Sequence, residues 1–212
     1  MTVGLGVLGR REVRRGGARG VLRWVRAHLG TTDHERRVAR LALELFDLTQ
    51  PLHGLGWRER RTLLLAALTH DVGRAVAEAD HHRAGARMVR TAELGLSARE
   101  RRRVSYLVRH HKGKLPAAAD DLRLRRDADP VGLRVLLGIL RAADGFDSRV
   151  WGRPRITMSL RGRRAARLCI AAESRLGEEA ARRIYARPKK LALLGAMLGC
   201  GVEVRWERAG SS

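Results

Sequence analysis

The feature that most constrains the fold is a histidine–aspartate pair at the end of an apolar helix. Residues 63–68 read LLLAAL, and His70-Asp71 follow after a single threonine. Leucines and alanines at this spacing predict a helix over residues 57–71 with one buried face. The end of such a helix lies against the core, where an imidazole and a carboxylate are costly unless they are paired or bind a metal. The fold must therefore bring partners to this pair.

Other polar residues recur at helix ends. Asp144 ends a second apolar helix, in the stretch Leu-Arg-Ala-Ala-Asp-Gly over residues 140–145. The chain has eight histidines, and most of them lie near the ends of predicted helices. They are His28, His34, His53, His70, His81, His82, His110 and His111. Buried imidazoles and carboxylates that meet from several helix ends are the donors of a metal site inside a helical bundle.

Apolar periodicity predicts a mainly α fold, with a small C-terminal α+β module. Spacings of three and four residues favour helices up to residue 144, including 21–29, one from 33 to about 48, 57–71, 80–94, 98–111 and 130–144. Alternation then predicts strands over 155–160 and 166–172, which form a β-hairpin, and a last strand over 202–206. Between them a helix is expected over 173–187, and the apolar residues 191–198 continue helically. We therefore expect a basic arm (1–20), a helical domain (21–150) and the small module (151–212).

Local signals refine two helix ends. Glu35 stands three residues after Thr32, a spacing that predicts a capping box, and Ser97 is a candidate N-cap for the helix over 98–111. Residues 50–56, with one proline and two glycines, are expected to form a loop. His53 in this loop is expected to pack or cap.

Composition indicates a cytoplasmic protein with no membrane segment. Hydrophobic residues make up 44% of the chain, which excludes a wholly disordered chain. The longest apolar stretch, residues 191–204, is too short to span a bilayer and contains glycines. Only two cysteines occur, Cys169 and Cys200, without a CxxC pair, which is typical of a reduced compartment. The N-terminal residues place apolar positions before positive charges, the reverse of a secretory leader.

The net charge of +22 leaves two interpretations open. A field this positive attracts polyanions such as polyphosphate or nucleic acid. Alternatively, arginine replaces lysine through the coding bias of a GC-rich genome, since only four of the 44 basic residues are lysine. Replacement accounts for the ratio of arginine to lysine but not for the excess of basic over acidic residues.

The ordered set His34, His70-Asp71 and Asp144 resembles the H…HD…D pattern of the HD-domain metal-dependent phosphohydrolases. Residues 34–53, the His81-His82 pair, residues 109–116 (RHHKGKLP) and residues 141–147 (RAADGFD) are similar to the C-terminal HD domain of exopolyphosphatase and guanosine pentaphosphate phosphohydrolase (Ppx/GppA). The resemblance covers roughly residues 21–206 and implies an HD-type helical bundle.

The resemblance also implies site residues. His34, His70, Asp71 and Asp144 take the positions of a first metal, and His82 and His111 those of a second, with His110 in reserve. Asp71 would bridge two divalent ions (Mn, Fe, Zn, Ni or Co, with Mg a further candidate), which activate a water. Arg74 and Lys112 would hold the phosphate. For His34, His70, Asp71 and Asp144 the alternative is hydrogen bonding at helix ends without a metal. For His82 and His111 the alternative is that they contact the first metal's ligands without binding a metal themselves.

Three further residues are assigned other roles. Asp147 is interpreted as an N-cap in preference to a ligand, and His28 and His81 as surface histidines.

Two functions follow as hypotheses. The first is a metal-dependent phosphohydrolase that cleaves a phosphomonoester or phosphoanhydride of a nucleotide or polyphosphate-like substrate. The second is a non-catalytic regulatory module that binds polyphosphate or nucleic acid and retains the metal site. In exopolyphosphatases the main hydrolytic site belongs to actin-like domains, which these 212 residues do not contain. A third hypothesis is a separately encoded partner that supplies these domains, and a homodimer is a further candidate. The apolar residues 191–198 would form either a docking surface for such a partner or part of the core.

Overall fold

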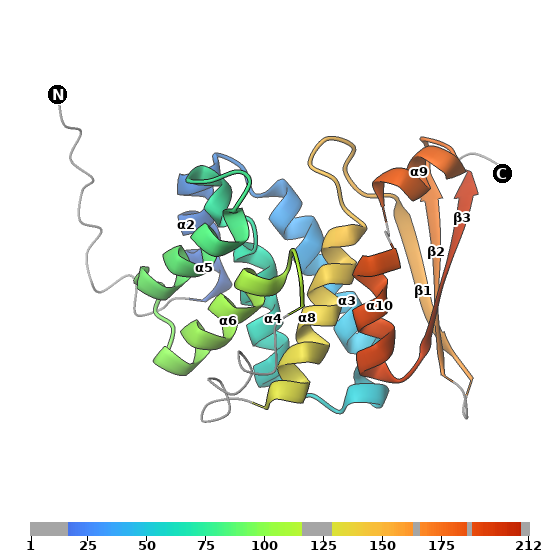
Figure 1. Ribbon diagram of the computed structural model, residues 1–212, viewed down its shortest axis with the longest axis horizontal. Coiled ribbons are helices and arrows are strands. Elements are labelled where there is room, and N and C mark those ends of the chain that lie inside the picture. The colour runs from blue at the N-terminus through green and yellow to red at the C-terminus, as the bar shows by residue number, and fades with distance from the viewer. Residues whose placement is uncertain (1–16, 116–128, 163–165, 186–187, 209–212) are drawn as a thin grey trace.

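The computed structural model describes residues 17–115, 129–162, 166–185 and 188–208. Within these residues the protein is mainly helical, with a small three-stranded sheet near the C-terminus, so the expected fold class is confirmed (Figure 1). The basic arm lies mostly outside the described residues, as does part of the hairpin turn. None of the described helices has the length and apolar character needed to cross a membrane.

The helical part is organised around one central helix. Helix α8 (Pro130–Gly145) contacts α3 (Asp33–His53), α4 (Trp57–Thr69) and α6 (Ala98–His110). It is apolar on nearly every side, and residues 135–143 are all buried. Three further elements pack on these helices: α2 (Ala18–Leu29) contacts α4, α5 (His81–Thr91) contacts α6, and the short 3-10 helix η1 (Val72–Ala75) contacts both α2 and α5. A buried central helix fixes the position of Asp144, in its last turn, inside the molecule.

The C-terminal segment is a small sheet joined to this bundle through a helix. Strands β1 (Arg155–Arg161) and β2 (Arg167–Ser174) pair antiparallel, and β3 (Gly201–Arg208) pairs parallel to β2. Helices α9 (Glu178–Ile184) and α10 (Pro188–Leu198) connect β2 to β3.

Helix α10 lies between α8 and the sheet (Figure 1). At its closest approach to α8, a Cβ on Gly138 would stand 3.1 Å from the Cα of Leu194. The leucines of α10 are buried, so core packing, rather than docking, accounts for the apolar residues 191–198.

Three local expectations were wrong. Helix α3 continues to His53, because the His53 side chain closes its end: Nε2 donates to the Phe46 carbonyl at 3.1 Å and Nδ1 accepts from the Leu55 amide at 3.0 Å. No capping box forms at Thr32, whose side chain makes no cap bond. The helix expected over residues 173–187 begins only at Glu178, because β2 extends to residue 174. The capping box at Ser97 does form, with Glu100.

One close approach positions the next turn of the chain. A Cβ on Gly73 in η1 would stand 2.0 Å from the carbonyl oxygen of His81 and 2.3 Å from the amide nitrogen of Gly85. Only glycine fits there, so η1 packs directly on the first turns of α5. This contact places the start of α5 beside the His70-Asp71 pair.

Candidate metal centre

Histidines and aspartates from the ends of five helices meet in the interior. His34 lies in the first turn of α3, His70 and Asp71 directly follow α4, and Asp144 is in the last turn of α8. The first residue of α5 and the residue after α6, His81 and His111, complete the cluster. Their donor atoms form two groups: His34, His70 and Asp144, and Asp71, His81 and His111.

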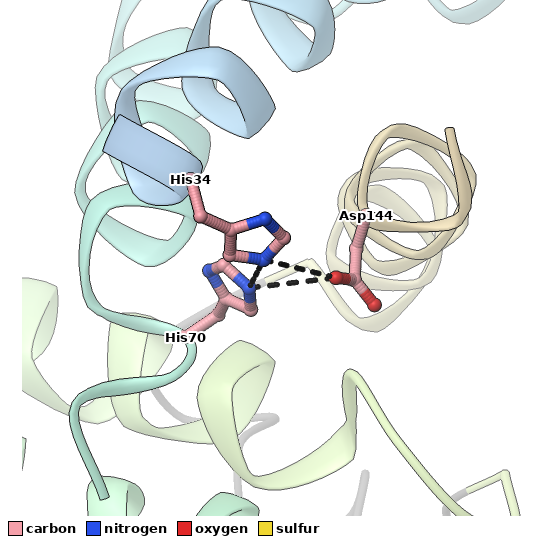
Figure 2. A group of neighbouring side chains, drawn as sticks. All are labelled: His34, His70 and Asp144. Atoms are coloured by element: carbon pink, nitrogen blue, oxygen red, sulfur yellow. Dashed lines mark hydrogen bonds and ion pairs between the residues drawn. The ribbon is translucent and has the colours of Figure 1, made fainter. Parts of the chain in front are cut away.

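The first group is shown in Figure 2. The Nε2 atoms of His34 and His70 are 3.2 Å apart, and Oδ1 of Asp144 lies 3.6 Å from the first and 3.5 Å from the second. The two imidazoles are buried, and the Asp144 side chain is 15% exposed. Three donor atoms at these separations surround a point that a single ion can occupy.

The second group gathers around one oxygen of Asp71. Its Oδ1 lies 3.2 Å from Nε2 of His81, 3.5 Å from Nε2 of His111 and 3.7 Å from Nε2 of His70. Its Oδ2 lies 3.8 Å from Nε2 of His34. Asp71 thus stands between the two groups, at the position that a bridging carboxylate would take.

The orientation of every imidazole is fixed by its other nitrogen. Nδ1 of His70, His81 and His111 donates to the carbonyl oxygen of the residue three positions earlier, at 2.7–2.8 Å. Nδ1 of His34 donates to Asp147 at 2.5 Å. A neutral ring that carries its hydrogen on Nδ1 presents a lone pair on Nε2. All four lone pairs face the cluster, which is the arrangement typical of metal-binding histidines.

This donor set fits a metal cation. Lone pairs on facing Nε2 atoms 3.2 Å apart repel each other unless a proton or a cation lies between them. Burial lowers the pKa of His70, but the carboxylates of Asp71 and Asp144 outweigh it and raise that pKa to about 9. Burial alone would raise the pKa of the Asp71 and Asp144 carboxyls. Their partners instead hold both pKa values well below the usual range: His70 and His111 act on Asp71, and Lys190, His34 and His70 act on Asp144. Each of these directions shows that the cluster attracts positive charge.

Imidazole and carboxylate donors together suit Mn, Fe, Co, Ni or Zn. A further carboxylate lies beside them. Glu35 is completely buried, and its Oε2 has no hydrogen-bond partner among the described residues.

Three cations reach the carboxylates from outside the cluster. Arg74 donates to Oδ2 of Asp71 at 2.7 Å, and Arg149 donates to the same oxygen at 3.0 Å and to Oε1 of Glu35. Lys190 pairs with Oδ2 of Asp144. Arg74, expected to hold phosphate, is therefore bonded to an expected ligand. Lys112 is exposed, and its charge is one of the causes that lower the pKa of His81 to about 4, after burial.

Of the His81-His82 pair, the structure brings His81 into this cluster, whereas the resemblance had implied His82. His81, expected at the surface, is buried and joins the second group, whereas His82 belongs to neither. The ring centre of His82 lies 6.5 Å from that of His111, and its buried Nδ1 has no hydrogen-bond partner among the described residues. The His110 ring packs on Tyr106 and also lies outside both groups.

Sequence reasoning missed Glu35, Arg149 and Lys190 as members of this site. The helical spacing of Glu35 from Val38 and Ala42, both buried, was a signal that could have found it. For Lys190 the only signal was the rarity of lysine, and for Arg149 there was none. Asp147 was expected to be an N-cap. In the structure its carboxylate accepts hydrogen bonds from His34 and Arg37.

Comparison with known protein families gives a match over the helical part of the chain. Residues 18–144 match the family described as Ppx/GppA phosphatase, domain III. The matched stretch includes all six donors of the two groups and ends at Asp144, so Arg149 and Lys190 lie beyond it. No curated protein matches the chain.

Proposed function

The chain belongs to the Ppx/GppA phosphatase domain III family, and from this premise we propose that it is a metal-dependent phosphohydrolase of the HD type. Its substrate is a phosphomonoester or a phosphoanhydride of a nucleotide or polyphosphate-like molecule. The observation that supports this most is the convergence of four imidazole Nε2 atoms, each fixed through Nδ1, on the carboxylates of Asp71 and Asp144.

The residues divide into two ligand sets. His34, His70 and Asp144 would hold one ion, and His81 and His111 the other, with Asp71 between them. When bound, divalent ions at such a centre acidify a water molecule and polarise a phosphoryl oxygen. The chain itself orients the rings through their Nδ1 bonds and keeps bulk water away by burying the imidazoles.

Elemental analysis of the purified protein tests this proposal. We expect two equivalents of a transition metal in the wild type, and loss of most of it in Asp71→Ala. The control is Asp47→Ala, since Asp47 is a surface residue that pairs with Arg60. The metal-loaded wild type should also release phosphate from at least one member of a panel of phosphate esters and anhydrides. A wild type without metal, and without turnover when manganese is added, would refute the proposal.

A second function is favoured by the charges around the cluster. Arg74, Arg149 and Lys190 surround the cluster and pair with the three carboxylates Asp71, Asp144 and Glu35. Together with the net charge of +22, this favours a non-catalytic module that binds polyphosphate or nucleic acid. Such a module would show tight binding that weakens steeply with salt, and no turnover.

A further inference from the structure

We propose that Arg149 and Lys190 hold the phosphate of the substrate, so that the segment after residue 144 completes the active site. This inference rests on the proposed function and concerns the same site. It also specifies the substrate class, because the charges around the site favour a terminal, doubly charged phosphate group.

The two cations lie directly beside the two ligand groups without entering them. On Asp71, Oδ1 faces the imidazoles, with His81 at 3.2 Å, while Oδ2 accepts from Arg149 at 3.0 Å. On Asp144, Oδ1 faces His70 at 3.5 Å, while Oδ2 pairs with Lys190. On Asp144 the oxygen that faces the ligand group is separate from the one that binds Lys190. On Asp71 the oxygen that faces His81 and His111 is separate from Oδ2, which binds Arg149 and lies 3.8 Å from Nε2 of His34. A metal and a cationic side chain can therefore bind the same carboxylate at the same time, each at a different oxygen.

The cations are also the part of the site that solvent reaches. The side chains of His70 and Asp71 are 0% and 4% exposed, whereas those of Arg149 and Lys190 are 30% and 28% exposed. An anion in solvent can therefore contact the guanidinium of Arg149 and the ammonium of Lys190.

Both cations keep donors for a ligand. Arg149 uses Nε and Nη2 in its contacts with Asp71 and Glu35, and a guanidinium has five N–H groups. Lys190 has three N–H groups and pairs with one carboxylate. Among the described residues these contacts leave Nη1 of Arg149, and further hydrogens of Lys190, to donate to phosphate oxygens.

Charge balance selects the kind of phosphate. Three carboxylates and three cations sum to zero, so two divalent ions would bring the centre to +4, and a hydroxide would leave +3. A terminal phosphate carries a charge of about −1.5 to −2 at neutral pH, and an internal phosphodiester only −1. The centre therefore binds a phosphomonoester, or the end of a phosphate chain, in preference to a diester.

The test measures the binding of inorganic phosphate to the manganese-loaded protein by calorimetry, alongside the manganese content of each variant. Arg149→Met and Lys190→Met should each weaken phosphate binding about 10-fold or more, because each removes a charge-assisted contact. Their manganese content should stay at the wild-type value. The matched controls are Arg155→Met and Lys189→Met, both exposed, and they should change the affinity less than twofold. Lys190→Arg, which keeps the charge, should retain most of the binding.

The outcomes separate this inference from the proposed function. A wild type that takes up no manganese would refute the proposed function and this inference with it. If the loaded Met variants bind phosphate as tightly as the wild type, only the inference is wrong. Loss of manganese in parallel with loss of phosphate binding would also refute it, because the two cations would then act only by positioning the carboxylates.

Discussion

Asp147 allows the most direct test of how the centre is held together. Its side chain is 1% exposed, and Oδ2 accepts from Nδ1 of His34 at 2.5 Å. The Arg37 guanidinium donates to Oδ1 at 2.7 Å and to Oδ2 at 3.0 Å. Asparagine has nearly the same shape, but one of its two polar atoms is an NH2 group, which cannot accept. Asp147→Asn must therefore lose either the bond from His34 or a bond from Arg37.

The expected magnitude follows from these contacts. Loss of a partner that orients a metal-binding histidine weakens metal binding about 10- to 100-fold, which corresponds to about 1.4–2.7 kcal/mol. His34 belongs only to the first group, so one of two equivalents should weaken while the other is unaffected. A hydrogen bond to a charged group contributes about 1.5–3 kcal/mol. We therefore also expect the free energy of unfolding of the metal-free protein to fall by about 2 kcal/mol.

The assay is a titration of manganese against a competing chelator, together with urea unfolding of the metal-free protein. The control is Asp33→Asn, since Asp33 is exposed in the first turn of the same helix and its side chain accepts from the Thr31 hydroxyl. Asp147→Ala removes both acceptors, so His34 has no partner there. If Asp147→Asn and Asp147→Ala both bind the two equivalents as tightly as the wild type, then the bond to His34 does not orient a metal ligand and the reasoning is refuted.

Three further predictions test other parts of the site. His81→Ala should reduce the metal content, measured by elemental analysis, from two equivalents to one, whereas His82→Ala should leave it at two. Equal losses in the two variants would contradict the assignment of His81, and not His82, to the second group. In metal-free protein the pKa of His70 is raised from 6.5 to about 9, so its contribution to stability, about 3 kcal/mol, is full below pH 6.5 and lost as the pH rises through 9. Urea unfolding at several pH values should show this decline, and bound metal should abolish it by displacing the proton. Gly73→Ala should lower the free energy of unfolding by about 3 kcal/mol, because its Cβ would overlap backbone atoms of α5, whereas Gly20→Ala, with no atom within 4 Å, should not destabilise the protein.

The sequence was sufficient to place the helices and the apolar core because the relevant signals are local. Leucines three and four residues apart determine which face of a helix is buried, and a polar residue at the end of such a helix must be buried with it. His70, Asp71 and Asp144 could be assigned to one interior cluster on this basis. The choice between His81 and His82 could not be made in this way. Successive helical residues point about 100° apart, so the packing of η1 on α5 decides which ring faces the cluster.

Contacts between distant elements have no comparable local signal. Glu35 follows Thr32 at the spacing of a capping box, yet it is completely buried and pairs with Arg149, 114 residues further along the chain. The bundle buries the first turn of α3 against the segment that follows α8. The Glu35 carboxylate is therefore removed from water, and it pairs with a cation from that segment instead of capping the helix. The same packing brings α10, and with it Lys190, to Asp144. The ligand donors thus lie within the stretch that matches the family, whereas two of the three cations beside them come from the chain that follows. If the proposed function holds, variation in that following segment would change which anion the site accepts and leave the proposed metal donors intact.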